Sequence, residues 1–239
     1  MSLPSLPFDP LRYPRVKIVS SFQELVTTRF SGNVNALCWP RTLAGDFEEI
    51  VRLISADEDI AALDEDLLRS LPLSAAGKLA VDTLIEDQRG LVALGLSPVL
   101  ECIRRYPTEE EPGIVPIDVY SFHADSATAE ADTYLCSYTE SASEGILNEE
   151  SICCIDVPET RARLLKDFGG SDDESFHEFL RDQCYNLHYV PLAGARPYPF
   201  GLGNFWRIAV DYPGNHVLPC VHRAPDTIPG RPARLLLIS

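Results

Sequence analysis

The pattern of apolar and polar positions changes near residue 110, from mainly helical spacing to mainly strand-like alternation. Before that point, residues 16–22 (VKIVSSF) and 33–39 (NVNALCW) alternate apolar or β-branched positions with polar ones, which predicts two short strands. After Asp46 the apolar positions recur at helical spacing. Four helices are expected here, at 46–54, from Asp64, over 74–94 and over 97–106. Ser97 suits the N-cap of the last helix and Pro98 its first position, so the segment 16–110 is predicted to be mainly helical.

Beyond the charged loop that follows Tyr106, short strands dominate the pattern. Strands are expected at 113–125, 132–140, 150–157, 187–192, 204–212, 217–224 and 233–239, and helices at 158–170 and 172–184. Asp156 or Thr160 is a candidate cap for the first of these helices, and Gly169 suits its end. A helical layer on antiparallel strands, an α+β fold with a sandwich or barrel core, is the predicted architecture. We expect one domain over 1–239, with a Pro-rich arm at 1–15 and the β core at 111–239.

Composition narrows the classes of partner. The chain has 239 residues, 45% of them hydrophobic, which is enough for a substantial core. Its formal net charge of −16 disfavours nucleic acid and anionic membrane surfaces as partners. The seven cysteines are odd in number and form no C-x-x-C pair, which is typical of reduced, buried thiols. With no signal-peptide pattern and no apolar run long enough to span a membrane, a cytoplasmic location is expected.

The stretch Ser121 to Ser126 (SFHADS) carries the clearest candidate chemistry. Side chains two apart on a strand point to the same face, so His123 and Asp125 converge. A third candidate, His222, lies in the predicted strand VLPCVHRAP, and Arg234 opens the last strand. Two imidazoles and one carboxylate leave open positions on a bound metal, as non-haem Fe(II) oxygenases require. The alternative is that both histidines are hydrogen-bonded structural residues and Asp125 caps a turn.

The order of these motifs resembles a known superfamily. FHAD, then VHR, then an arginine opening the final strand are similar to the Fe(II)/2-oxoglutarate-dependent dioxygenases, whose fold is a double-stranded β-helix of the jelly-roll or cupin-like type. NVNALCWPR, TYLCSYTE, VHRAP and RLLLIS, within 33–239, resemble more closely a bacterial domain family of unknown function. Where that family has a Gly-Pro-Gly-Thr turn this chain has TESASEG, so we expect a different loop at the pocket mouth.

The resemblance implies a cofactor and a set of ligands. His123, Asp125 and His222 would be the Fe(II) ligands, and Arg234 would bind the distal carboxylate of 2-oxoglutarate, since a guanidinium pairs with a carboxylate through two parallel hydrogen bonds. Arg231 is the alternative anchor, although it lies in a loop between Gly230 and Pro232.

Further pocket candidates come from strand parity. Tyr134 and Tyr138 share a face that could point into the barrel, where Tyr134 could offer its hydroxyl to 2-oxoglutarate, or both could be packing aromatics. Asn204 and Trp206 share another face and are candidate substrate contacts, and Arg207, on the opposite face, is a candidate for a substrate carboxylate. The remaining candidates are expected to be structural: Arg223 in an ion pair and His188 in a hydrogen bond.

These expectations favour a mononuclear Fe(II), 2-oxoglutarate-dependent dioxygenase that uses O₂ to hydroxylate or otherwise oxidise a small molecule. One alternative is a cupin-like metal protein that does not use 2-oxoglutarate, with zinc as an alternative to iron. Another is a non-catalytic module that binds a basic partner through the acidic stretch SADEDIAALDEDLL. A nucleophilic pair of Cys220 and His222 is a further rival, because the two side chains would share a strand face.

Overall fold

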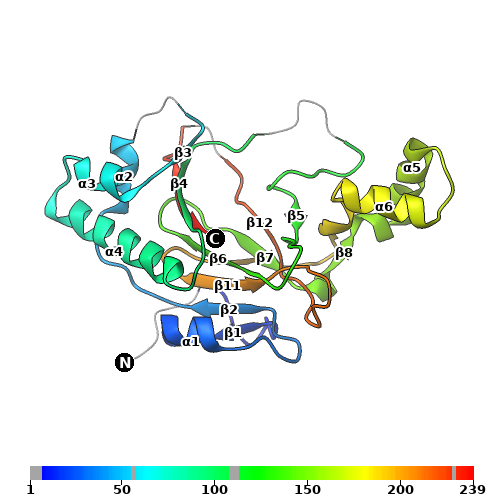
Figure 1. Cartoon of the computed structure of the whole chain (residues 1–239), viewed down its shortest axis with the longest axis horizontal. Helices are drawn as coiled ribbons and strands as arrows, with labels where there is room; N and C mark the ends of the chain where they lie inside the picture. The colour runs from blue at the N-terminus through cyan, green and yellow to red at the C-terminus, as the bar shows by residue number, and fades with distance from the viewer. Residues whose placement is uncertain (1–6, 55–57, 108–112, 228–229) are drawn as a thin grey trace.

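The computed structural model describes residues 7–54, 58–107, 113–227 and 230–239. Two sheets form its centre (Figure 1), one with the strand order β1-β2-β11-β6-β13-β4-β3 and the other with the order β10-β7-β12-β5-β9-β8. The strands are β1 (Val16–Ile18), β2 (Ala36–Trp39), β3 (Ile60–Ala62), β4 (Val99–Ile103), β5 (Phe122–His123), β6 (Asp132–Ser137), β7 (Glu144–Ile146), β8 (Ser151–Cys153), β9 (His188–Pro191), β10 (Tyr198–Pro199), β11 (Phe205–Ala209), β12 (Val221–Arg223) and β13 (Arg234–Ile238). Neighbouring strands are antiparallel, except that β1 and β2 are parallel.

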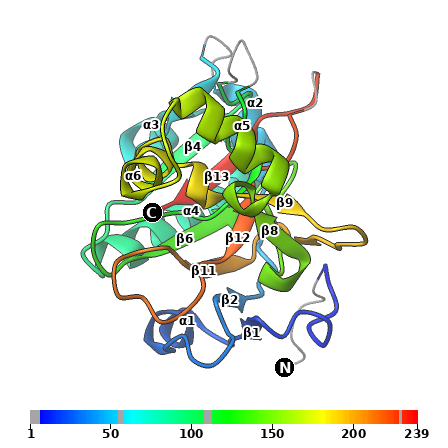
Figure 2. The same cartoon turned by 90° about the vertical axis from the view of Figure 1, so that its right-hand side faces the viewer.

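The helices form two groups. They are α1 (Phe22–Thr27), α2 (Phe47–Leu53), α3 (Glu65–Ser70), α4 (Ala75–Val92), α5 (Pro158–Phe168) and α6 (Glu174–Asp182), with short 3₁₀ turns at Asn148–Glu150, Cys154–Asp156 and Tyr185–Leu187. Side-chain oxygens of Ser21, Asp46, Asp64, Ser74 and Asp173 accept backbone N–H groups at the starts of five of these helices, so the local sequence sets where they begin. In Figure 1 the helices α5 and α6 lie together on the right, apart from α1–α4, and Figure 2 turns that side toward the viewer.

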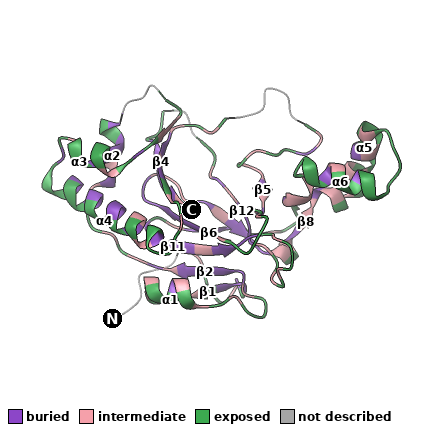
Figure 3. Cartoon of the chain, in the orientation of Figure 1, coloured by how far each residue is buried: buried purple, intermediate pink, exposed green. Residues whose placement is uncertain are grey.

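Apolar side chains bury the seven-stranded sheet on both faces. Leu235 of β13 packs with the helices, whereas its neighbour Leu236 belongs to a second cluster that lies between the two sheets with Tyr198 and Trp206. Burying one such side chain fully contributes roughly 1.5–3 kcal/mol. The buried positions therefore concentrate along the central strands, and the outer faces of the helices are exposed (Figure 3).

Several elements differ from the sequence expectations. The segment predicted as a helix over 97–106 is the strand β4, which pairs with β13 along its whole length. Its residues alternate, with Leu100 and Cys102 toward the helices and Ile103 toward the other sheet, so pairing overrides the capping signal of Ser97 and Pro98. The predicted strand 16–22 ends at Ile18, and α1 begins at Phe22.

The remaining differences are smaller. The long strand expected at 113–125 is reduced to β5, and β7 lies in a segment expected to be a loop. Helix α5 has Val157 at its N-cap without a side-chain bond, rather than Asp156 or Thr160, and Gly169 ends it as expected. Residues 1–6 of the predicted arm lie outside the described residues. The rest of the arm packs inward, with the ring centroids of Phe8 and Tyr13 5.5 and 4.6 Å from that of Tyr198.

Candidate metal centre

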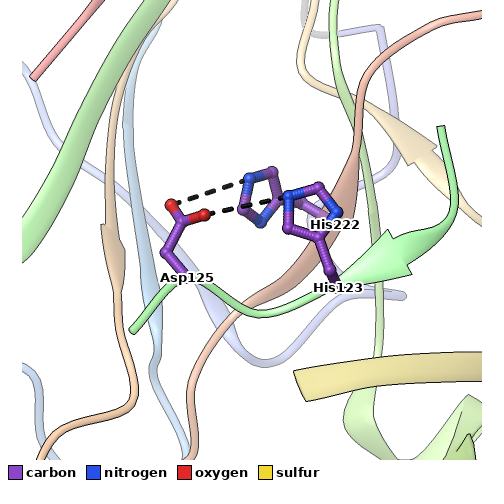
Figure 4. Close-up of side chains that lie close together, drawn as sticks. All are labelled: His123, Asp125 and His222. Carbon is purple, nitrogen blue, oxygen red and sulfur yellow. Dashed lines mark ion pairs between the residues drawn. The ribbon is translucent and has the colours of Figure 1, made fainter. Parts of the chain in front are cut away.

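Three side chains converge on one point in the six-stranded sheet (Figure 4). His123 of β5 and His222 of β12 are direct partners in the antiparallel register, so their rings lie on the same face with centroids 4.7 Å apart. Asp125 follows β5 and places one carboxylate oxygen 3.8 Å from Nε2 of His123 and the other 3.8 Å from Nε2 of His222. One ligand atom from each of the three residues lies within 4.8 Å of the other two.

Long-range hydrogen bonds hold the chain after β5 in place. The backbone N–H of Ala124 donates to the carbonyl of Leu187 at 2.8 Å, and that of Asp211 donates to the carbonyl of Asp125 at 2.8 Å. The hydroxyl of Thr133, on β6, donates to Oδ2 of Asp125 at 2.5 Å. The carboxylate therefore has a set position although it lies beyond the end of its strand.

The backbone also determines which nitrogen of each histidine faces the carboxylate. Nδ1 of His123 lies 2.9 Å from the carbonyl oxygen of Ser121, and Nδ1 of His222 lies 3.3 Å from that of Cys220. A carbonyl oxygen can only accept, so in both rings Nδ1 carries the proton and Nε2 presents its lone pair. Two lone pairs and a carboxylate then face one another with no donor between them, which is the arrangement that a cation stabilises.

The electrostatic environment favours the protonation states that a metal site needs. Burial, together with the nearby His222, lowers the pKa of His123 from 6.5 to about 4. Burial alone would raise the pKa of Asp125, but His222 and the hydrogen bond from Thr133 outweigh it, and the pKa lies below its ordinary value. Near neutral pH His123 is thus neutral and Asp125 anionic, as binding of a divalent cation would require.

The donor set fits a divalent transition metal. Two nitrogens and one carboxylate oxygen on one face leave positions open for other ligands, which suits Fe(II) and also catalytic zinc. The Asp125 side chain is 29% exposed whereas that of His222 is 7% exposed, so the approach to the centre is on the side of Asp125.

Arg234 is a buried guanidinium whose partners are hydroxyl groups. It donates to Tyr106 at 3.0 Å, to Ser137 at 2.9 Å and to Ser143 at 2.7 Å. Among the described residues no carboxylate pairs with it, and its Nε has no acceptor. Burial lowers its pKa, although Tyr106 and Glu101 act in the opposite direction. An anionic ligand would supply the acceptor that Nε lacks.

Strand geometry places Arg234 in the same space between the sheets as His123, Asp125 and His222. Ser143, which binds Arg234, lies two residues and roughly 7 Å before Gly145, the register partner of His222. On β6, Thr133 binds Asp125 and Ser137 binds Arg234, and these alternate residues share a face. The cluster and the guanidinium thus face the space between the two sheets.

A small cavity adjoins Arg234. Its volume is about 30 Å³, and Tyr106, Glu140 and Arg231 are among the residues that line it. The alternative anchor Arg231 is exposed there and forms an ion pair with Glu140 at 3.1 Å. Arg223 pairs with Glu144 at 2.8 Å, so the expected structural ion pair is confirmed.

Tyr134 does not face the metal centre, which corrects the expectation for this residue. Thr133 and Ser137 occupy the inner face of β6, so Tyr134 and Tyr138 point to the opposite face and join the cluster that packs against the helices. The shared face inferred from the sequence is confirmed, and of the two roles left open for these tyrosines the structure shows packing in the core, because parity alone does not tell which face is inside.

The three candidate substrate contacts have their polar groups bonded within the protein. Asn204 donates to the carbonyl of Phe200 at 2.9 Å, and the indole N–H of Trp206 donates to the same carbonyl at 2.9 Å. Arg207 pairs with Asp132 and donates to the carbonyls of Leu25, Val26 and Thr28. All three side chains thus have structural bonds within the protein, and their contact with a substrate stays a prediction.

His188 and Cys220 also lie near the candidate centre. His188 pairs directly with His123 across β5 and β9, with ring centroids 5.8 Å apart, and its Nδ1 lies 2.9 Å from the hydroxyl of Ser121. This is the hydrogen-bonded role expected for His188, but its position beside His123 depends on a long-range pairing. Burial raises the pKa of Cys220 to about 12, so its thiol stays protonated and does not support a Cys–His nucleophile.

Comparison of the chain with protein-family models, with curated proteins and with solved structures gave no match. Among the described residues no helix is both long and apolar enough to cross a membrane. Function must therefore be inferred from the geometry of the site.

Proposed function

We propose that the protein is a mononuclear non-haem Fe(II), 2-oxoglutarate-dependent dioxygenase that oxidises a small molecule. The observation that carries this proposal is the convergence of His123, Asp125 and His222, with both Nε2 lone pairs directed at a carboxylate. The buried guanidinium of Arg234, whose described hydrogen-bond partners are hydroxyl groups, supports a co-substrate that carries its own carboxylate.

The order of the strands supports a double-stranded β-helix. Taken along the chain, β4, β5, β6 and β7 alternate between the two sheets, and β10, β11, β12 and β13 do so again. Within the sheets they form the contiguous runs β11-β6-β13-β4 and β10-β7-β12-β5. Eight antiparallel strands divided between two facing sheets in this way are typical of the jelly roll.

The residues of this chain would each do a defined task. His123, Asp125 and His222 would hold the iron, and the carbonyls of Ser121 and Cys220 keep the two imidazoles in the ligating tautomer. When bound, the iron with 2-oxoglutarate and O₂ supplies the oxidising power to break a C–H bond.

Other residues would bind the co-substrate and exclude water. Arg234 would donate to the distal carboxylate of 2-oxoglutarate, with the hydroxyls of Ser137 and Ser143 fixing the guanidinium. The ring of Phe200 stacks on that of Trp206 at 4.2 Å and lies 6.3 Å from the ring of His222. This apolar wall keeps water from the buried side of the centre.

One observation favours a second candidate, a cupin-like metal protein that does not use 2-oxoglutarate. The cavity beside Arg234 has a volume of about 30 Å³, room for little more than one or two water molecules. A bound dicarboxylate would require movement around it, for example of the exposed Arg231. The second candidate keeps the three metal ligands and is indifferent to Arg234.

Anaerobic titration of the metal-free protein tests both candidates. Fe(II) is added first and 2-oxoglutarate second, while the visible charge-transfer absorption of a chelated keto acid is recorded. The dioxygenase proposal expects the absorption in the wild type, its loss in His222→Ala, and a weakened co-substrate affinity in Arg234→Met. A matched control, His177→Ala on the exposed face of α6, is expected to behave as the wild type.

The outcomes separate the candidates. If Fe(II) binds but no absorption develops at any 2-oxoglutarate concentration, the second candidate is correct. If neither iron nor zinc binds, the metal centre itself is refuted.

A further inference from the structure

A second cavity lies on the helix side of the seven-stranded sheet, lined by residues of α4, α1 and the segment after β2. Its volume is about 610 Å³, within the range of small-molecule sites. Trp39 lines it from the helix-facing side of β2, whereas the neighbouring Cys38 belongs to the cluster between the sheets. The sheet thus separates this cavity from the candidate metal centre.

Aromatic side chains form one wall of this cavity. Trp39 of β2 and Phe22 of α1 both line it, and their ring centroids are 6.3 Å apart. Gly90 of α4 makes room for the second ring, since an added Cβ would lie 3.2 Å from Cζ of Phe22. Two rings at an angle of 54° offer the π-faces and edges that bind organic cations and apolar groups.

A neutralised ion pair forms the floor. The guanidinium of Arg41 binds both carboxylate oxygens of Asp87, at 2.7 and 2.8 Å, and its Nε donates to the carbonyl of Gly203 at 2.9 Å. The side chains of Arg41 and Asp87 are only 9% and 8% exposed. Because the charge of Arg41 is already paired with that of Asp87 inside the protein, the floor offers no unpaired cation to an anionic ligand.

The remaining charge at the cavity is negative. Glu86 is exposed at the rim, one residue before Asp87, and no ion pair holds it among the described residues. Arg41 contributes one positive charge to the lining, and Asp87 and Glu86 contribute one negative charge each, so the lining carries a net charge of −1. The formal net charge of the whole chain, −16, also favours a cationic ligand.

We infer that this cavity binds a small organic cation, an ammonium group that carries an aromatic or apolar arm. The ammonium group would lie between the carboxylate of Glu86 and the rings of Trp39 and Phe22, and the arm would fill the apolar part beside Leu43. The inference does not depend on the metal centre, because none of the metal ligands lines this cavity.

Intrinsic fluorescence provides the test, because the chain has two tryptophans and only Trp39 lines the cavity. Trp206 is 0% exposed in the core and should not respond. The probe is 2-phenylethylamine, compared with 2-phenylethanol and phenylacetate, which are of similar size but neutral and anionic. A saturable change in emission is expected with the amine, whose affinity should exceed that of phenylacetate by about tenfold.

Four variants make the result specific. Glu86→Gln should weaken amine binding about threefold and leave binding of the alcohol unchanged, while Glu178→Gln on α6, which removes the same charge elsewhere, should have no effect. In Trp39→Phe the emission change should disappear while calorimetry still detects amine binding. His222→Ala should bind the amine as the wild type does.

Some results would overturn the inference. They are no saturable response to the amine, equal affinities for the three probes, or a Glu86→Gln variant that binds the amine as tightly as the wild type. Loss of amine binding in His222→Ala would also overturn it, because the cavity would then not be independent of the metal centre.

Discussion

Replacing Gly145 by alanine should disturb both the core between the sheets and the candidate metal centre. Gly145 lies on β7 directly opposite His222, and the ring of Tyr198 passes over it. A Cβ at this position would lie 2.4 Å from Cζ and 2.6 Å from the hydroxyl oxygen of Tyr198, and 2.8 Å from Cε1 of Phe200. The backbone here is ordinary for a strand, so the glycine is required for space rather than for conformation.

The structure sets the size of the effect. Carbon atoms pack best at roughly 3.5–4.0 Å, so the new methyl group would overlap Tyr198 by about 1 Å or more. Tyr198 and Phe200 are 1% and 2% exposed, so neither ring can move toward solvent. Overpacking of this kind costs about 1–3 kcal/mol, and we expect the upper part of that range. Because Phe200 lies against His222, we also expect Co(II) affinity to fall by about tenfold.

Urea unfolding of the metal-free protein, followed by circular dichroism, measures the free energy of unfolding, and a Co(II) titration measures the affinity. The control is Gly90→Ala, where the nearest atom to the new Cβ is the edge of Phe22 at 3.2 Å and α4 gains helix propensity. That variant should unfold close to the wild type. If Gly145→Ala loses less than about 0.5 kcal/mol, the reasoning from packing is refuted.

Three further predictions concern other contacts. Asp87→Leu should cost about 3–5 kcal/mol in the free energy of unfolding because it leaves the buried Arg41 uncompensated. In a double-mutant cycle the pair Asp87→Leu with Arg41→Met should cost clearly less than the sum of the single changes, and additivity would contradict this. Thr133→Val removes the hydrogen bond to Asp125 and should weaken Co(II) binding about tenfold, with little change in the urea midpoint. Because the pKa of His123 is lowered to about 4 in the folded protein, the unfolded chain binds more protons than the folded one between about pH 4 and 6.5. The metal-free protein should therefore lose stability as the pH falls through this window. The loss is at most about 1.4 kcal/mol per pH unit. Unfolding of His123→Gln over the same pH range should show a weaker dependence, and an unchanged slope would refute the assignment.

The helices show how much secondary structure the local sequence can predict. Those over 75–92, 158–168 and 174–182 were predicted within a few residues, because spacing of apolar residues and capping groups act over single turns. The segment around Val99–Ile103 carried an equally good capping signal and forms a strand. Its pairing with β13 places Leu100 and Cys102 in the core, and burial there outweighs the local preference for a helix.

In the candidate site, too, the sequence predicts some features and the tertiary structure decides others. That His123 and Asp125 share a face follows from the period of an extended chain, and so does the opposite orientation of Arg223 relative to His222. The alternation of residues also established that Tyr134 and Tyr138 share a face. No local pattern could tell that this face meets the helices, because the choice depends on which sheet covers each side.

The sequence by itself therefore determined the residue types of the candidate centre, the parity of each strand and the acidic character of the chain. Only the tertiary structure decided that β5 and β12 are neighbours, that His222 lies opposite His123, and that hydroxyl groups rather than a carboxylate surround Arg234. The physical reason is that periodicity is a property of a few consecutive residues, whereas strand pairing and the inner face of a sheet follow from burying the whole set of apolar residues at once.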